Sequence, residues 1–341
     1  MTLVPTRALV NKLIEHLGPR VETDVVLGPL TTFRVGGPAD ALVRVHSIPE
    51  VEAVARAVQA SGIDTMVVGQ GSNLLVGDAG YRGLVIVLGG EFTRATFAGL
   101  VESGNPETAP VEVPAEVTAG AGVKMPVLAR QAAARGGSGL EWMVGVPGSV
   151  GGGVRMNAGG HGSSVSSCLI DVRLWSLDAA EARTVPADQL GLGYRQSNLR
   201  PNDVVLTARF ALGLRDAASA DAELTDIVRW RREHQPGGAN CGSVFTNPHG
   251  DSAGRLIDSA GLRGFRIGTA SVSEKHANFI QADENATAAD IWALIIEVRR
   301  RVHETFGVVL HPEVRTAGFD ASLSSPSSTS PGGSHPIPDV P

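Results

Sequence analysis

Two glycine-rich segments carry the residue types best suited to binding a ligand. The first, Gly69-Gln70-Gly71-Ser72-Asn73-Leu74, follows a short apolar run, and its glycines would let backbone amides approach phosphate oxygens. The second runs from Gly145 to Gly153 and continues through 156–160, and so many small residues in succession would let a planar ligand lie against the backbone. An ordinary strand–turn and a flexible linker are the alternatives, although the valines of the second segment recur as if packed.

Other nucleotide and hydrolase motifs are incomplete. The first segment lacks the third glycine of the dinucleotide fingerprint, and the chain has no G-K-[ST] phosphate loop. Residues 250–254 match G-x-S-x-G, but a nucleophile elbow needs a preceding strand, and Asn247-Pro248-His249 indicates a turn. We therefore expect Asp251 or Ser252 to cap a helix there.

Histidine and cysteine spacing argues against a metal centre. The nine histidines form no H-E-x-x-H pattern, and His276 is interpreted as a hydrogen-bonded structural residue rather than a metal ligand. Cys168 and Cys241 are far apart in sequence and no C-x-x-C occurs, so neither a zinc site nor a disulfide framework is indicated.

Hydrophobic periodicity predicts the elements that must position these loops. Apolar residues at helical spacing predict an N-terminal helix and a helix over 288–306 that starts at Thr287 and ends before Gly307. Ser47 and Glu50 form the pattern of a capping box at the start of the helix expected at 48–61. Closely spaced strands favour an α+β fold over a doubly wound parallel sheet. The remaining expectations are helices at 48–61, 126–135 and 222–233, strands at 65–68, 84–88, 168–177 and 203–213, and a surface insertion at 102–110.

Composition limits the class of protein. The net charge of −6 and an aromatic content of 4% argue against a nucleic-acid binder. No apolar run reaches the length of a membrane helix and the N-terminus lacks a secretory apolar region, so we expect no membrane insertion and a cytoplasmic location. The expected units are 1–90, 91–215 and 216–318, with a disordered Ser/Pro/Gly-rich tail at 319–341.

Read in order, these loops resemble the UDP-N-acetylenolpyruvoylglucosamine reductases, also called UDP-N-acetylmuramate dehydrogenases. One matching segment would be weak, but seven in the same order over about 20–318 are specific. The segments are Thr31–Ala39, Gly69–Leu75, Gly145–Gly153 with Met156–Gly159, Gly193–Ser197, Gly242–Pro248, Val272–Phe279 and Pro312–Arg315.

The resemblance implies a fold, two cofactors and a reaction. The implied fold is α+β, with a two-lobed FAD-binding domain of the vanillyl-alcohol-oxidase type (lobes 1–90 and 91–215) and a smaller α+β substrate domain (216–318). FAD and NADPH are the implied cofactors, and a sugar nucleotide is the implied substrate, reduced from its enolpyruvyl ether to UDP-N-acetylmuramate. Transient contact with other enzymes of cell-wall precursor synthesis stays open. The implied FAD-binding residues are Arg34, Val35, Gly36, Gly69, Gln70, Gly71, Ser72, Asn73, Leu74, Gly145, Val146, Pro147, Gly148, Ser149, Gly151, Gly152, Asn157, Ala158 and Gly159.

The resemblance also assigns catalytic roles to Arg195, Ser243 and Glu313. A guanidinium can hold the enolpyruvyl carboxylate and stabilise an enolate, a protonated carboxylic acid can donate to it, and a nearby serine can protonate the adjacent carbon. Taken singly, the three residues would be interpreted as a surface ion pair, a turn hydroxyl and a strand ion pair. The implied substrate-binding residues are Tyr194, Asn247, Lys275 and His276, with Arg231 or Arg232 as partners for phosphates.

Several positions depart from the family pattern. Leu30, Arg155 and Thr246 replace types that are frequent in relatives, and the short interval between Arg195 and Ser243 resembles the subtype without an extra tyrosine-bearing substrate loop. Two other functions stay open at this stage. An oxidase with covalently tethered flavin would use a residue such as His161, and a sugar-nucleotide sensor would bind without catalysis.

Overall fold

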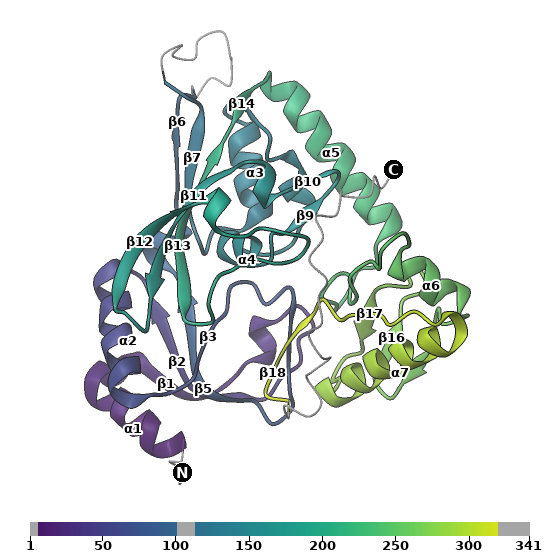
Figure 1. The fold of residues 1–341 in the computed structure, drawn as a ribbon, viewed down its shortest axis with the longest axis horizontal. Coiled ribbons are helices and arrows are strands. Elements are labelled where there is room, and N and C mark those ends of the chain that lie inside the picture. Colours follow the sequence, from purple (N-terminus) through teal and green to yellow (C-terminus); the bar gives the residue numbers. More distant parts are fainter. Residues whose placement is uncertain (1–5, 101–112, 320–341) are drawn as a thin grey trace.

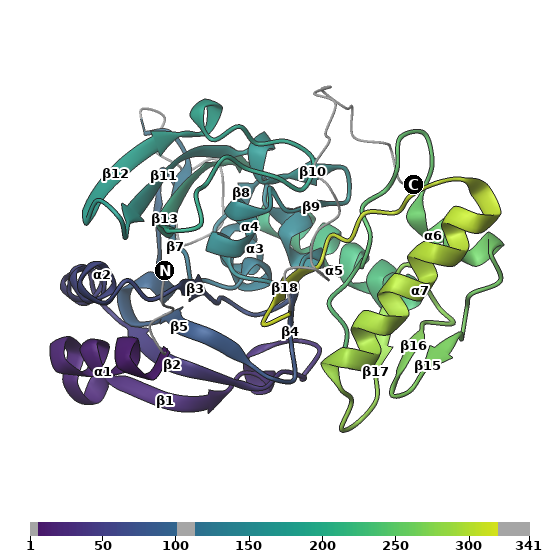
Figure 2. The ribbon, with the colours of Figure 1, turned by 60° about the horizontal axis from the view of Figure 1, so that its bottom comes forward.

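The computed structural model describes residues 6–100 and 113–319, which form two lobes and a third, smaller unit (Figure 1). The first lobe runs along the bottom of Figure 2, the second lies above it, and the third packs beside both. The helices are α1 (Thr6–Leu17), α2 (Ile48–Ser61), α3 (Met125–Ala133), α4 (Val150–Arg155), α5 (Ala217–His234), α6 (Ala253–Ser259) and α7 (Ala288–Phe306).

The first lobe is a mixed four-stranded sheet in the order β1-β2-β5-β3. Strands β2, β5 and β3 are parallel, and β1 pairs antiparallel with β2. Helices α1 and α2 bury apolar side chains such as Leu13 and Val54 in the core of this lobe. The strands are β1 (Val21–Val26), β2 (Pro38–Val45), β3 (Thr65–Val67), β4 (Leu74–Val76) and β5 (Tyr81–Leu88).

The second lobe is built on an antiparallel five-stranded sheet in the order β12-β11-β13-β7-β6. Its core includes apolar residues of α3 and of the first half of α5, among them Leu128 and Leu224. The strands are β6 (Ala95–Ala98), β7 (Glu116–Gly120), β8 (Gly137–Ser138), β9 (Gly159–Gly160), β10 (Ser163–Ser164), β11 (Leu169–Ser176), β12 (Glu181–Pro186), β13 (Asp203–Ala211) and β14 (Gly213–Leu214).

The third unit packs α6 and α7 against a small antiparallel sheet, β15-β16-β17. The final strand, β18, leaves this unit and pairs in parallel with β4, so the chain returns to the first lobe. Helix α5 lies within 216–318 but buries apolar residues in the core of the second lobe. The strands are β15 (Arg266–Ile267), β16 (Ala270–Val272), β17 (Ile280–Ala282) and β18 (Arg315–Ala317).

Most of the expected elements are confirmed. Helices α2 and α7 occupy the predicted ranges, Thr287 caps α7 and Gly307 ends it in the left-handed conformation. Helix α5 is longer than the predicted 222–233, since it begins at Ala217 and ends at His234. The capping box at α2 is wrong, because Ser47 makes no side-chain cap and Glu50 accepts from the backbone N–H of His46 instead.

Two of the predicted segments lie largely outside the residues that the structure describes. The insertion expected at 102–110 and most of the expected tail, 320–341, lie outside the described residues. The first tail residue, Phe319, is described, and its ring centroid lies 5.5 Å from that of Trp292. Within the described part of the chain, no helix is both long and apolar enough to cross a membrane.

Candidate active site

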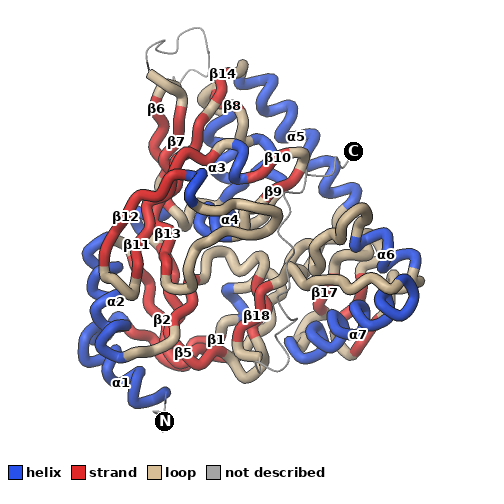
Figure 3. The backbone as a smooth tube through the Cα atoms, in the orientation of Figure 1, coloured by secondary structure: helices blue, strands red, loops and turns tan. Residues whose placement is uncertain are grey.

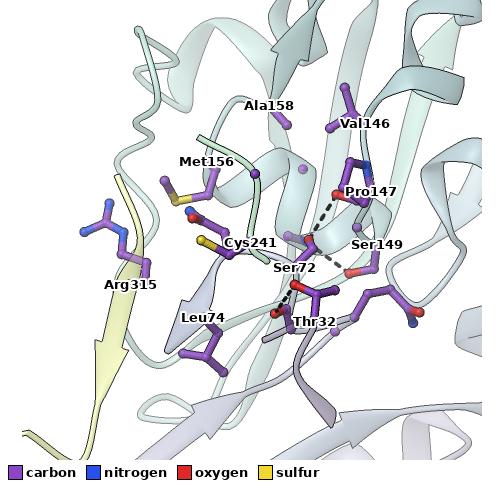
Figure 4. Close-up of a pocket in the computed structure, with 18 of the residues that line it drawn as sticks. Thr32, Ser72, Leu74, Val146, Pro147, Ser149, Met156, Ala158, Cys241 and Arg315 are labelled. Carbon is purple, nitrogen blue, oxygen red and sulfur yellow. Dashed lines mark hydrogen bonds between the residues drawn. The ribbon is translucent and has the colours of Figure 1, made fainter. Parts of the chain in front are cut away.

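Loops from all three units converge on one cavity of about 630 Å³. Figure 3 shows long loop segments in the region between α4, β18 and the third unit. Residues 69–74 and 145–149 form part of the lining, and most residues of 235–243 together with Glu313 form another part. The close-up shows side chains of these segments, including Ser72, Cys241 and Arg315, around the hollow (Figure 4).

Close packing explains several of the glycines in these loops. A Cβ at Gly69 would lie 2.1 Å from the Ser149 hydroxyl oxygen, and one at Gly71, whose φ is +56°, would lie 2.1 Å from the Leu30 carbonyl oxygen. The Ser72 hydroxyl donates to the Pro147 carbonyl oxygen at 3.0 Å and so joins the two glycine-rich segments (Figure 4). The two lobes therefore approach each other closely at this wall.

Asn73 fixes the segment that carries Glu313. Its side-chain amide donates to the Glu313 carbonyl oxygen at 3.1 Å, and its own carbonyl accepts from the Arg315 N–H at 3.0 Å. These bonds lie next to the parallel pairing in which Arg315 is opposite Leu74. The first glycine-rich loop thus positions the main chain around Glu313 through hydrogen bonds from Asn73 and to its carbonyl.

The segment of Ser243 lies directly beside that of Glu313. The N–H of Glu313 donates to the Val244 carbonyl oxygen at 2.7 Å. The Asn278 side chain holds the same segment, because its carbonyl oxygen accepts from the Phe245 N–H at 3.0 Å and its amide donates to the Phe245 carbonyl at 2.8 Å. Among the described residues the Ser243 hydroxyl has no hydrogen-bond partner, although the residue lines the cavity, so it is available to a ligand.

Arg195 completes a cluster with Glu313 on the same cavity. Its Nε lies 3.0 Å from the Glu313 Oε1, and its Nη2 donates to the Gly159 carbonyl oxygen at 3.0 Å. Arg195 has a φ of +56°, which is uncommon for a residue with a side chain and persists only where the surrounding structure holds it. Burial raises the pKa of the Glu313 carboxyl group, and the positive charges of Arg195 and Arg315 partly oppose that rise.

The cavity is suited to an anionic ligand. Glu313 is the one acidic residue among the lining residues described, whereas four arginines line the cavity. Arg155 donates to the carbonyls of Leu199, Arg200 and Asp203, but Arg231 and Arg315 form no ion pair with a carboxylate in the described part of the chain. Burial also lowers the pKa of the Arg231 guanidinium, whose Nε donates to the neutral Gln235 side-chain carbonyl at 2.8 Å. A diphosphate would supply a compensating charge.

These features fit FAD. A glycine-lined wall gives a flat ring room to approach the backbone, and unpaired arginines suit a diphosphate. Fourteen of the residues expected to bind FAD line the cavity: Gly69, Gln70, Gly71, Ser72, Asn73, Leu74, Gly145, Val146, Pro147, Gly148, Ser149, Gly152, Ala158 and Gly159.

Five of the expected FAD-binding residues do not line this cavity. Val35 is buried in the core of the third unit, and a Cβ at Gly36 would lie 2.7 Å from the Val76 side chain. A Cβ at Gly151 would lie 2.9 Å from the Ala121 Cβ, so this glycine is explained by helix packing. Arg34 lies beside Val35 in sequence, with a φ of +60°, and Asn157 lines a different cavity.

A second cavity of about 620 Å³ adjoins the first at Gly159 and Arg195. Its lining includes Tyr194 and Asn247, whose N–H donates to the Tyr194 hydroxyl at 3.4 Å. His161 also lies here and not in the lining of the first cavity, and burial and the charge of Arg231 lower the pKa of its imidazole.

Lys275 and His276 line neither cavity. The Lys275 Nζ donates to the Arg232 carbonyl oxygen at 2.5 Å. The His276 Nδ1 accepts from the Asn278 N–H at 3.2 Å, and burial lowers the pKa of its imidazole, as expected for a structural histidine. Over 6–100 and 113–319, no cluster of three or more His, Cys, Asp or Glu side chains could bind a metal.

Sequence reasoning missed part of the lining. Arg315, Gln235 and Asn240 line the first cavity, and the alternation of Glu313 and Arg315 was the one signal that pointed to Arg315. The G-x-S-x-G segment is a helix cap, as predicted, because Ser252 accepts from the Arg255 N–H. Cys241 lines the cavity, but burial raises the pKa of its thiol and makes it a poor nucleophile.

Comparison with known proteins first defines the class. Residues 39–180 match the family profile described as an FAD binding domain, so the chain is an FAD-binding flavoprotein. Residues 234–317 match the profile of the UDP-N-acetylenolpyruvoylglucosamine reductase C-terminal domain. A reductase of that name from Synechococcus sp. (strain JA-3-3Ab) is 39% identical over 316 residues, which cover 92% of this chain and 96% of the relative.

The particular family follows from these matches. A reductase of the same name from Paramagnetospirillum magneticum is 40% identical over 314 residues, which cover 92% of this chain and 96% of the relative. The crystal structure of the reductase from Thermus caldophilus superposes with a TM-score of 0.72 at 36% identity, covering 87% of this chain and 99% of that one. The chain belongs to the UDP-N-acetylenolpyruvoylglucosamine reductase family, and it is an FAD-dependent oxidoreductase. The expected fold class, α+β with a two-lobed FAD-binding domain and a smaller α+β unit, is confirmed.

Proposed function

We propose that this protein uses NADPH and FAD to reduce the enolpyruvyl ether of UDP-N-acetylglucosamine enolpyruvate, which yields UDP-N-acetylmuramate. The single observation that carries the proposal is that Arg195, Ser243 and Glu313, from three separate stretches of sequence, line one cavity next to the glycine-rich loops. The proposed substrate is the one named in the related reductases. A cytoplasmic location stays a prediction from the sequence.

The first cavity would hold FAD through residues 69–74 and 145–149, with Arg231 and Arg315 available to its diphosphate. Bound FAD, once reduced by NADPH, supplies hydride for the terminal vinyl carbon of the substrate. The adjoining second cavity, with Tyr194 and Asn247 in its lining, is our proposed place for part of the sugar nucleotide. Lys275 and His276 are less well supported as substrate contacts because they lie outside both linings.

The three clustered side chains would divide the remaining chemistry. Arg195 would bind the enolpyruvyl carboxylate and stabilise the negative charge that develops on it as hydride arrives. Burial raises the pKa of Glu313 against the opposing charge of Arg195, and in its protonated form Glu313 would donate a hydrogen bond to that carboxylate. Ser243, whose hydroxyl has no partner among the described residues, would deliver the proton to the carbon next to the one that receives hydride.

The test measures the two half-reactions of the Ser243→Ala variant separately. Reduction of bound FAD by NADPH should stay within about twofold of wild type, while reoxidation by the enolpyruvyl sugar nucleotide should fall by roughly 10²- to 10⁴-fold, the usual range for loss of a proton donor. Ser259→Ala, an exposed serine of α6, is the matched control and should change neither rate. Equal loss of both half-reactions would contradict Ser243 as the proton donor, and a protein that cannot bind FAD would end the proposal.

A further inference from the structure

Asn157 is a buried residue whose side-chain amide is held in one orientation. It is 7% exposed and has a φ of +41°, a conformation that asparagine tolerates better than most residues. Its Oδ1 accepts from the Ser166 N–H at 2.9 Å, and its Nδ2 donates to the Gly193 carbonyl oxygen at 2.9 Å and to the Ser166 hydroxyl at 3.3 Å. The amide therefore cannot be reversed without placing like groups against each other.

The Gly193 carbonyl belongs to the tight turn that presents Arg195. Gly193 and Gln196 are paired as an isolated bridge, with the Gln196 N–H donating to the Gly193 carbonyl at 3.3 Å. Arg195 lies inside this turn in the left-handed conformation, and its guanidinium donates to the Gly159 carbonyl, two residues beyond Asn157. Asn157 thus holds the Gly193 carbonyl at the start of the turn, and Gly159 accepts from the Arg195 guanidinium within it.

We propose that Asn157 is a positioning residue for Arg195 in the reaction, an inference that rests on the proposed function. A strained arginine persists only where its surroundings over-determine its backbone. The Asn157 amide provides one such restraint, because it ties the Gly193 carbonyl of the turn to the buried residue that follows α4. Without it the turn relaxes, and the guanidinium leaves its position 3.0 Å from the Glu313 carboxylate.

Asn157→Asp removes the bonds that Nδ2 donates, to the Gly193 carbonyl and to the Ser166 hydroxyl. Aspartate also tolerates a positive φ and retains an acceptor for the Ser166 N–H, but it has no donor for the Gly193 carbonyl. Asn157→Gly keeps the backbone conformation and removes all three side-chain hydrogen bonds, and it serves if the aspartate variant does not fold. Asn285→Asp is the matched control, because Asn285 is exposed, has a φ of +63° and lines neither cavity.

The experiment measures both half-reactions, FAD affinity and a crystal structure of Asn157→Asp. We expect the step that consumes the sugar nucleotide to fall roughly 10- to 100-fold, the loss that a misplacement of about 1 Å produces. Reduction by NADPH and FAD affinity should stay within about twofold, and the Arg195 Nε should lie more than about 4 Å from Glu313, beyond ion-pair contact. The control should match wild type in every measurement.

The outcomes separate this inference from the proposed function. If wild type turns over and Asn157→Asp does so equally well, the positioning role is refuted while the function stands. If FAD affinity falls at least tenfold and the substrate half-reaction is intact, Asn157 binds cofactor instead. If wild type does not act on the sugar nucleotide, the function fails, and the crystal structure decides the inference, because an undisplaced Arg195 overturns it.

Discussion

Gly152 offers a test in which stability and cofactor affinity should change in opposite directions. It lies in α4 and lines the first cavity, and an added Cβ would meet only the Ser149 hydroxyl oxygen at 3.5 Å, an ordinary contact. Gly152→Ala should therefore be accepted by the protein without rearrangement. The new methyl group would occupy space that we assign to FAD.

The magnitudes follow from general values for these effects. Replacing glycine by alanine within a helix stabilises by roughly 0.5–1 kcal/mol, which should raise the melting temperature of the apoprotein by roughly 1–3 °C. A methyl group forced against a well-packed partner costs typically 1–3 kcal/mol. FAD affinity should then fall roughly five- to 150-fold.

The assay pairs thermal unfolding of the flavin-free protein with FAD titration followed by flavin fluorescence. Gly151→Ala is the matched control on the same helix, because its Cβ would lie 2.9 Å from the Ala121 Cβ and away from the cavity. That variant should melt at a lower temperature than wild type. A Gly152→Ala protein that melts higher yet binds FAD as tightly as wild type would refute the assignment of this wall to the cofactor.

Three further results are expected. Asp78→Ala should lower the free energy of unfolding by roughly 1–2 kcal/mol in urea titrations, because the Asp78 carboxylate accepts from two N–H groups at the start of α7; an unchanged midpoint would contradict a stabilising role. The His276 imidazole has a lowered pKa in the folded state, so its contribution to stability is complete above about pH 6.5 and is lost as the pH falls below that value. His276→Gln should accordingly lose less stability than wild type between pH 7.5 and roughly pH 5, measured by urea unfolding, and parallel losses would contradict this. Lys275→Met should leave the KM for the sugar nucleotide within about threefold, since its ammonium contacts the Arg232 carbonyl outside both cavities; a much larger rise in steady-state assays would restore it as a substrate contact.

Local patterns were sufficient to predict many of the secondary-structure elements. The spacing of apolar residues located α7, and Thr287 and Gly307 marked its ends, because helix termini are stabilised by neighbours in sequence. The order of the glycine-rich and polar segments indicated the family. The predicted capping box at Ser47 does not form: Glu50 accepts from the His46 N–H, and the Glu91 carboxylate accepts from the Ile48 N–H.

The arrangement of the site depended on contacts between distant parts of the chain. The sequence supplied Arg195, Ser243 and Glu313, but their meeting at one cavity depends on the return of β18 to β4 and on the bond between Glu313 and Val244. Likewise, nothing local distinguishes Gly151, which packs against Ala121, from Gly152, which lines the cavity. A residue's type and near neighbours set its conformational preferences, whereas the atoms its side chain meets are set by long-range packing of the whole chain.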